Sequence, residues 1–302
     1  MKLTTIFASL ALAAATAMSP AFAAEITIKH AQGETTLPDT PKKVLVFDMA
    51  SLDTLDALGV EVAGVPGGNK PGSLKKYEGD EYLKVGTLFE PDFEAVNAAE
   101  PDLIIVGGRS APKYADLSKI APTIDMTSAP DDFLNNMKTN VKTLASVFGK
   151  DQEAEAKLAK LDESIAALKE KTADAGRVLT ILTTGGRMSA HGKGGRFTIV
   201  YEDFGMTPAA EGLEVGTHGQ AISNEFILET NPDWLLVVDR DAAIGQEGQA
   251  AEQVLNNELV TQTNAWKNNH VVYLNAANWY IIGGGLNAVQ ANVDELLAAF
   301  SK

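Results

Sequence analysis

Three arginines stand in loops where their guanidinium groups can meet an anion. Arg196 lies in the glycine-rich segment 192–197, and Arg109 and Arg240 each follow an apolar run. A guanidinium presents a planar fork of N–H donors that suits negatively charged oxygen groups, although a single arginine of this kind is more often a solvated surface charge. The chain is acidic, with a formal net charge of −15, so an anionic ligand requires positive charge gathered at one place.

His218 and Tyr280 add two groups that can bind a metal. The four histidines of the chain show no His-x-His or His-x₃-His spacing, so a dedicated zinc site is not expected. One imidazole can still fill a vacant position on a metal that a chelator brings, and a phenolate is a hard oxygen donor suited to ferric iron. The alternative is that neither residue binds a metal: His218 is then an exposed loop residue and Tyr280 an aromatic side chain packed under a loop. Trp279, beside Tyr280, is expected to line the same pocket.

A repeated pattern puts two of the arginines in equivalent positions. In each copy a glutamate is followed after seven residues by Pro-Asp, then by an apolar run, and after fifteen residues by an arginine. The copies run from Glu94 through Pro101 and Asp102 to Arg109, and from Glu225 through Pro232 and Asp233 to Arg240. Ligands of open α/β sheets bind beyond the carboxyl ends of the strands, so both arginines are predicted to face one crevice from two similar lobes. The two glutamates begin the preceding helices and are available to a partner on the outer rim of each lobe.

Apolar runs predict alternating strands and helices on both sides of one long helix. The predicted strands are 44–48, 62–65, 103–106, 178–182, 235–238 and 271–274, and the shorter helices begin at Ser51, run over 93–99 and begin at Asn287. Residues 151–175 lack Gly and Pro and carry an apolar stripe, which predicts a helix of roughly 24 residues. The stripe spans only about two heptads, too few to favour a coiled-coil dimer. The predicted fold class is α/β: two lobes with mostly parallel sheets, 24–150 and 176–302, joined by a single long backbone helix over 151–175.

The N-terminus has the features of a signal peptide, expected to cover residues 1–23. Lys2 precedes an apolar run from Ile6 to Met18, and Ala21-Phe22-Ala23 fits a signal-peptidase site. The run is too short for a comfortable membrane span, although a retained N-terminal anchor is the alternative. There is no cysteine, hence no thiolate ligand and no lipid attachment site. We therefore expect a soluble periplasmic protein, whose acidity makes nucleic acid and anionic lipid poor partners.

Taken together, these features resemble the periplasmic siderophore-binding proteins of the helical-backbone class, which also includes B12- and haem-binding relatives. The resemblance covers essentially the whole mature chain, through the two Glu…Pro-Asp…strand units and the long helix. It is greatest to the branch that binds ferric complexes of tetradentate catecholate siderophores. In that branch three arginines surround the anionic catecholate, and a histidine and a tyrosine complete the coordination of iron. The matching residues are Arg109, Arg196, Arg240, His218 and Tyr280.

The resemblance also implies partners. A glutamate on each lobe docks on arginines of the inner-membrane ABC permease, and Glu94 and Glu225 occupy these places. Fe³⁺ would arrive as the siderophore complex, with no intrinsic cofactor, and the protein would act as a monomer. A chelate with four oxygen donors leaves two positions open on six-coordinate iron and carries negative charge, in keeping with one histidine, one tyrosine and three arginines.

Other functions remain open at this stage. The same fold can bind haem, cobalamin or another metal chelate, although an arginine triplet does not suit a largely neutral ligand. An enzyme, such as a periplasmic hydrolase or reductase, is not expected, because the chain has no Gly-x-Ser-x-Gly element, no cysteine and no evident paired-carboxylate motif. A pure interaction module would have no use for a crevice lined with arginines.

Overall fold

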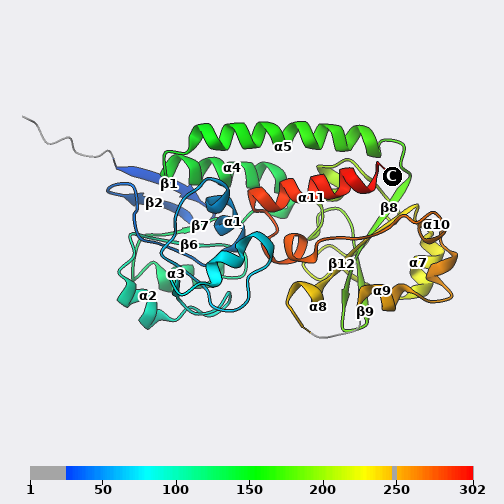
Figure 1. The fold of residues 1–302 in the computed structure, drawn as a ribbon, viewed down its shortest axis with the longest axis horizontal. Helices are drawn as coiled ribbons and strands as arrows, with labels where there is room; N and C mark the ends of the chain where they lie inside the picture. The colour runs from blue at the N-terminus through cyan, green and yellow to red at the C-terminus, as the bar shows by residue number, and fades with distance from the viewer. Residues whose placement is uncertain (1–24, 247–249, 302) are drawn as a thin grey trace, which may run out of the picture.

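Two sheets, one in each half of the chain, form the centres of two lobes in the computed structural model (Figure 1). The structure describes residues 25–246 and 250–301, so the expected signal peptide over 1–23 lies outside the described residues. The predicted α/β class with two lobes is confirmed. No helix within the described ranges is both long enough and apolar enough to cross a membrane.

The N-terminal sheet is parallel throughout. Its strand order is β5-β4-β3-β6-β7, and these strands cover Leu83–Lys84, Gly64–Val65, Val44–Val46, Leu103–Val106 and Thr123–Asp125. An antiparallel pair, β1 (Ile26–His30) and β2 (Gly33–Leu37), precedes it. Strands β3 and β6 are buried along their whole length, which explains their continuous apolar sequences.

The C-terminal sheet is mixed. Its order is β11-β9-β8-β12-β13, with β10 also paired to β8; the strands cover Gln220–Ile222, Arg187–His191, Arg177–Thr184, Trp234–Asp239, Val271–Tyr273 and, for β10, Thr207–Pro208. Strands β8, β10, β12 and β13 pair in parallel, whereas β9 pairs antiparallel with both β8 and β11. A hairpin therefore interrupts the βα alternation in this lobe, which the apolar runs alone did not predict.

Helices cover both sheets. The longer ones are α1 (Met49–Ala57), α4 (Phe133–Val147), α5 (Asp151–Thr172) and α11 (Leu286–Ala299). The shorter ones are α2 (Phe93–Ala99), α3 (Tyr114–Leu117), α6 (Ile199–Glu202), α7 (Asn224–Thr230), α8 (Arg240–Ala243), α9 (Ala251–Leu255) and α10 (Asn264–Lys267). A 3₁₀-helix covers 72–78, single 3₁₀ turns lie at 111–113, 130–132 and 260–262, and a π-helical turn covers 277–282.

The long helix α5 extends along the molecule above both lobes (Figure 1). It ends at Thr172, three residues before the predicted end at 175, and Gly176 follows with a positive φ of 91°. The predicted apolar stripe is the buried face: Ala154, Leu158, Leu161, Ile165 and Leu168. This face packs against α4 and α11, so the stripe serves the protein's own core.

Helix α11 is a second link between the lobes, although the chain was expected to join them through one helix. It follows the C-terminal sheet in sequence, yet it packs against α1 of the N-terminal lobe as well as against α5. The backbone of its first turn donates hydrogen bonds to α1 side chains: Ala288 N–H to Asp53 Oδ2 (3.0 Å) and Leu286 N–H to Thr54 Oγ1 (3.2 Å). The approach is close enough that a Cβ on Gly285 would lie 2.4 Å from Asp53 Oδ2.

Two predicted helix starts were wrong. Helix α1 begins at Met49, because Asp48 is its N-cap and accepts hydrogen bonds from both Ser51 N–H (2.8 Å) and Ser51 Oγ (2.7 Å). Helix α11 begins at Leu286, so Asn287 lies inside its first turn. In the second case the capping side chain comes from the other lobe, which a local sequence pattern cannot reveal.

The internal repeat is present in three dimensions. Helices α2 and α7 both end in a left-handed residue, Glu100 (φ 45°) and Asn231 (φ 43°). Asp102 Oδ2 then accepts a hydrogen bond from Lys43 N–H (2.8 Å), and Asp233 Oδ2 accepts one from Arg177 N–H (2.8 Å). Each aspartate thereby fixes the start of the neighbouring central strand, so the Pro-Asp turns do the same structural work in both lobes.

Candidate functional site

Tyr280 lies at the centre of the candidate site, in the π-helical turn that leads from β13 to α11. The three predicted arginines surround its ring. The guanidinium carbon lies 4.6 Å from the ring centroid for Arg196, 5.5 Å for Arg109 and 5.8 Å for Arg240. These are cation–π distances, and the structure brings together four side chains from four separate regions of the chain.

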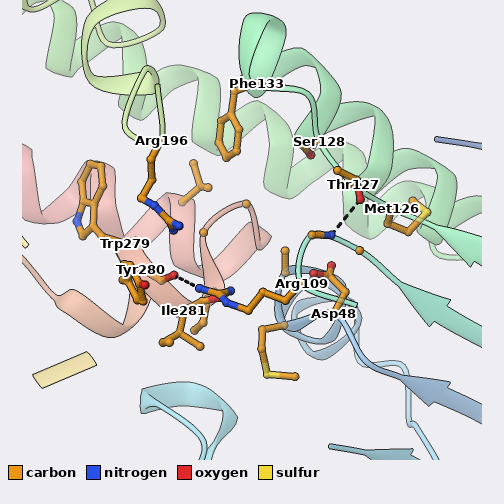
Figure 2. A pocket seen from close by; sticks show the side chains of 18 of the residues that line it. Asp48, Arg109, Met126, Thr127, Ser128, Phe133, Arg196, Trp279, Tyr280 and Ile281 are labelled. Atoms are coloured by element: carbon orange, nitrogen blue, oxygen red, sulfur yellow. Dashed lines mark hydrogen bonds between the residues drawn. The ribbon is translucent and has the colours of Figure 1, made fainter. Parts of the chain in front are cut away.

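Arg109 reaches from the N-terminal lobe to the opposite wall. It follows β6, and its guanidinium donates to the carbonyl oxygens of Tyr280 (2.8 Å) and Ile281 (3.2 Å) (Figure 2). These two hydrogen bonds join the lobes across the crevice. Part of the hydrogen-bonding capacity of Arg109 is therefore used to hold the Tyr280 turn, beside the space where an anion would bind.

Arg240 and Arg196 come from the C-terminal lobe. Arg240 begins α8, directly after β12, and its Nε donates to the Tyr280 hydroxyl at 3.0 Å. Arg196 lies in the glycine-rich loop before α6 and donates to the carbonyl oxygen of Thr217 at 3.1 Å. The prediction that Arg109 and Arg240 face one crevice from the ends of equivalent strands agrees with this geometry.

Positive charge is concentrated at this site. Burial lowers the pKa of Arg196, Tyr280 opposes that change, and the nearby guanidinium groups of Arg109 and Arg240 lower the pKa further. The cations therefore destabilise one another in a partly buried setting. An anion placed among them would relieve this repulsion, which gives the site a preference for negative charge.

The crevice is divided into three pockets, and Tyr280 lines all of them. We call the first the inner pocket, about 200 Å³, bordered by Asp48, Arg109, Arg196, Trp279 and Tyr280 (Figure 2). The second, the histidine pocket, is about 470 Å³ and is bordered by Arg187, Arg196, His218, Arg240 and Tyr280. The third, the apolar side pocket, is about 560 Å³; it shares Arg109 with the inner pocket and Arg240 with the histidine pocket.

His218 is exposed and borders the same pocket as Tyr280, so the two predicted metal-binding groups face a common space. Its loop is packed tightly against a second histidine. A Cβ on Gly219 would lie 2.8 Å from His191 Cε1, and His191 is buried with no hydrogen-bond partner for its Nδ1. Burial, together with the charges of Arg196 and His218, lowers the pKa of His191 to about 4. A neutral His191 therefore supports the loop that carries His218.

Trp279 lines the inner pocket, as predicted, but is buried. Its indole N–H donates to Glu295 Oε2 of α11 at 3.1 Å, and its ring meets the edge of Phe197 with centroids 6.2 Å apart. These contacts hold the turn that carries Tyr280. The structure thus gives Trp279 a supporting position in the wall of the crevice.

Arg187 is a crevice residue that sequence reasoning missed. It begins β9, directly after the Gly185-Gly186 turn at the carboxyl end of β8, and lines the histidine pocket with an exposed side chain. The position after a predicted strand, 178–182, was the available signal.

Glu94 and Glu225 lie away from the crevice. Each is exposed in the first turn of its helix, α2 in one lobe and α7 in the other (Figure 1). Over residues 25–246 and 250–301, no group of three or more His, Cys, Asp or Glu side chains is arranged to hold a metal ion.

The chain is similar to known proteins over almost its whole length. A model of the periplasmic binding protein family matches residues 44–277. The petrobactin-binding protein YclQ of Bacillus subtilis is 41% identical over 92% of this chain and 89% of its own length. Its crystal structure superimposes with a TM-score of 0.88 over 92% of this chain and 99% of that one, at 40% identity.

Two Vibrio proteins extend the comparison. The ferric-anguibactin-binding protein FatB of Vibrio anguillarum is 31% identical over 91% of this chain and 87% of its own. The periplasmic catecholate-siderophore binding protein VctP of Vibrio cholerae is 35% identical, with a TM-score of 0.87 over 91% of this chain and 100% of that chain. With two lobes, an arginine-lined crevice and this match over most of its length, the chain belongs to the periplasmic binding protein family.

Proposed function

We propose that this protein is the substrate-binding component of an ABC importer and carries a ferric siderophore in the crevice between its lobes. The observation that supports this most directly is the ring of three guanidinium groups around Tyr280, contributed by both lobes. A largely neutral chelate such as cobalamin has no need of three cations. The names of the related proteins, for petrobactin, anguibactin and catecholate siderophores, point to the same class of ligand.

The ligand we propose is a ferric complex with four catecholate oxygen donors. Such a chelate leaves two coordination positions of the iron vacant. The imidazole of His218 and the phenol of Tyr280 both border the histidine pocket and could fill them. Arg196 and Arg240 border that pocket and would neutralise the anionic chelate. Trp279 and Arg109 support the wall behind Tyr280. Iron is the cargo here, and the role is binding, without catalysis.

The lobes would move little on binding. Helices α5 and α11 both cross between them, and Arg109 already bonds to the opposite wall. We propose that the protein works as a monomer in the periplasm after removal of residues 1–23, with lobes over 24–150 and 176–302. We further propose that Glu94 and Glu225, one on each lobe, contact the inner-membrane permease, because both are exposed and occupy matching places in the repeat.

Fluorescence titration of the purified protein tests the ligand class. Trp279 borders the crevice, so a bound ferric chelate is expected to quench emission. The titration should compare a ferric bis-catecholate with ferric citrate, a ferric hydroxamate, haem and cobalamin. Tight binding of the bis-catecholate alone supports the proposal. Preference for haem or cobalamin would retain a binding protein of this family but overturn the siderophore assignment.

A further inference from the structure

The apolar side pocket shares Tyr280 and Arg240 with the histidine pocket, and none of the roles above uses it. Its volume is about 560 Å³, and both lobes line it. Its larger apolar lining residues are Pro71, Leu88, Phe89, Ile244 and Ile281. Because it also contains Arg109, Arg240 and Tyr280, it is continuous with the arginine ring.

Two large apolar side chains face water in this pocket. Phe89 of the N-terminal lobe is 58% exposed, and Ile244 of the C-terminal lobe is 40% exposed. Exposed apolar groups that border a cavity typically mark a binding surface. Here one comes from each lobe, so an occupant of the pocket would be covered from two sides.

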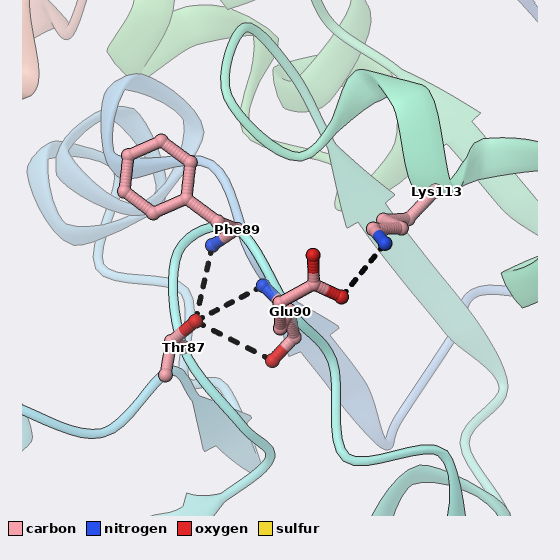
Figure 3. Close-up of polar contacts among 4 residues, drawn as sticks. All are labelled: Thr87, Phe89, Glu90 and Lys113. Carbon is pink, nitrogen blue, oxygen red and sulfur yellow. Dashed lines mark hydrogen bonds and ion pairs between the residues drawn. The ribbon is translucent and has the colours of Figure 1, made fainter.

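The turn that carries Phe89 is held firmly in place (Figure 3). Thr87 Oγ1 accepts hydrogen bonds from the N–H groups of Phe89 (3.3 Å) and Glu90 (3.0 Å), and Thr87 N–H donates to the Glu90 carbonyl (2.8 Å). The Glu90 carboxylate pairs with Lys113 Nζ at 2.7 Å. Gly86 begins the turn with φ 112°, where a Cβ would lie 2.4 Å from the Glu90 carbonyl oxygen. A fixed turn lowers the entropy cost of using Phe89 as a contact.

Lys70, a lysine that borders the pocket, does not make it a second anion site. Its side chain is turned to the backbone carbonyl oxygens of Pro66 and Gly68, the latter at 3.0 Å, and the residue is only 7% exposed. The other two cations that border the pocket, Arg109 and Arg240, both bond to Tyr280. The pocket therefore has one charged wall, shared with the chelate site, and one apolar wall.

We propose that the apolar side pocket binds the aliphatic linker that joins the chelating groups of the siderophore, with Phe89 and Ile244 closing on it from the two lobes. This inference rests on the proposed function, because it places the iron-binding end beside His218 and Tyr280. The linker then extends past Tyr280 into the side pocket. The pocket selects siderophores with a long apolar linker over compact chelates such as ferric citrate, which leave it empty.

The test uses two ferric bis-catecholamide probes that differ only in the linker, hexamethylene in one and ethylene in the other. Affinities are measured for the wild type and for Phe89→Ala and Ile244→Ala. The matched control is Phe93→Ala, which truncates a phenylalanine that is 38% exposed and does not border the pocket. All three sites are exposed, so the variants are expected to fold, which thermal unfolding checks.

We expect the wild type to prefer the hexamethylene probe. Phe89→Ala and Ile244→Ala should each lower the affinity for that probe roughly five- to ten-fold and leave the affinity for the ethylene probe unchanged. Phe93→Ala should bind both probes as the wild type does. Equal loss for both probes, or no loss for either, overturns the side-pocket assignment while the proposed function stands. Failure of the wild type to bind either probe overturns the proposed function, and the assignment with it.

Discussion

The carboxylate of Asp53 accepts a hydrogen bond of 3.0 Å from the backbone N–H of Ala288, so that a side chain of α1 caps the helix that returns from the other lobe. Both groups are buried. The contact therefore joins the lobes in the interior, where water cannot substitute for either hydrogen-bonding partner, and its strength should depend on the ionisation of Asp53.

Stability should depend on pH through Asp53. Burial raises its pKa from 3.8 to about 6, against the hydrogen bonds from Ala288 and Asn287. The folded protein therefore holds this proton more tightly than the unfolded chain, and stability falls as pH rises from about 4 to about 6. The cost above that window is about 3 kcal/mol at most.

Asp53→Asn keeps an acceptor for Ala288 N–H and removes the titration. Urea unfolding at pH 4 and at pH 7 should therefore show the variant gaining stability relative to the wild type as pH rises. Asp53→Ala, which loses the cap, should be less stable than Asp53→Asn at both values. Parallel pH profiles for the wild type and Asp53→Asn would contradict the prediction.

Arg196 and Arg240 should determine affinity for an anionic chelate. Arg196→Gln or Arg240→Gln is expected to weaken binding of a ferric bis-catecholate about ten- to hundred-fold and to flatten the dependence of affinity on salt. Arg177→Gln is the control, because its guanidinium bonds to the Asn231 carbonyl (3.0 Å) outside the crevice. Isothermal titration at low and high salt measures both effects. A loss in the control as large as in the crevice variants would refute a local electrostatic role.

Tyr280 and His218 should contact iron directly. Tyr280→Phe retains the aromatic ring beside the arginines but removes the oxygen donor, and His218→Ala removes the imidazole. Each change should shift the visible charge-transfer band of the bound ferric complex and weaken binding about ten-fold. The corresponding gallium complex, which lacks the band, reports affinity alone. Unchanged spectra in both variants would be compatible with siderophore binding but would refute direct coordination of iron by Tyr280 and His218.

Arg187 should act as a third cation at the histidine pocket, beside Arg196 and Arg240. Its side chain is exposed on the pocket wall, so its contribution should be smaller than that of the partly buried arginines. We expect Arg187→Gln to weaken the bis-catecholate about three-fold and mainly at low salt. Stopped-flow association rates at two ionic strengths provide the measurement; equal rates for variant and wild type would show that Arg187 does not contribute.

Glu94 and Glu225 should affect transport and leave ligand binding intact. Glu94→Lys and Glu225→Lys are expected to lower siderophore uptake in cells, because the reversed charge would repel a basic docking surface on the proposed permease, while fluorescence titration shows unchanged affinity. Glu163→Lys reverses an exposed charge on α5 and serves as the control. Normal uptake by the double variant Glu94→Lys, Glu225→Lys would refute the docking assignment.

Much of this architecture follows from local sequence. Strand β6 and helix α2 cover the predicted residues, and α5 ends three residues early, because continuous apolar runs and helical stripes reflect burial along a single element. The repeat also predicted that Arg109 and Arg240 face one crevice, since each follows a strand of its own sheet and ligands of open α/β sheets bind beyond the carboxyl ends of the strands.

Other features depend on contacts between distant residues. Arg109 bonds to Tyr280, 171 positions further along the chain, and α11 takes its cap from Asp53, 235 positions before Ala288. Arg187 and Phe89 likewise line pockets that are completed by residues distant in the sequence, so their place in the crevice cannot be predicted from their own segments. Near neighbours in the chain set most of the helices and strands and the residue types at their ends, so these can be predicted from the sequence. Packing between the lobes sets which of those ends meet around Tyr280 and where an apolar pocket opens beside it, so these features appear only in the folded protein.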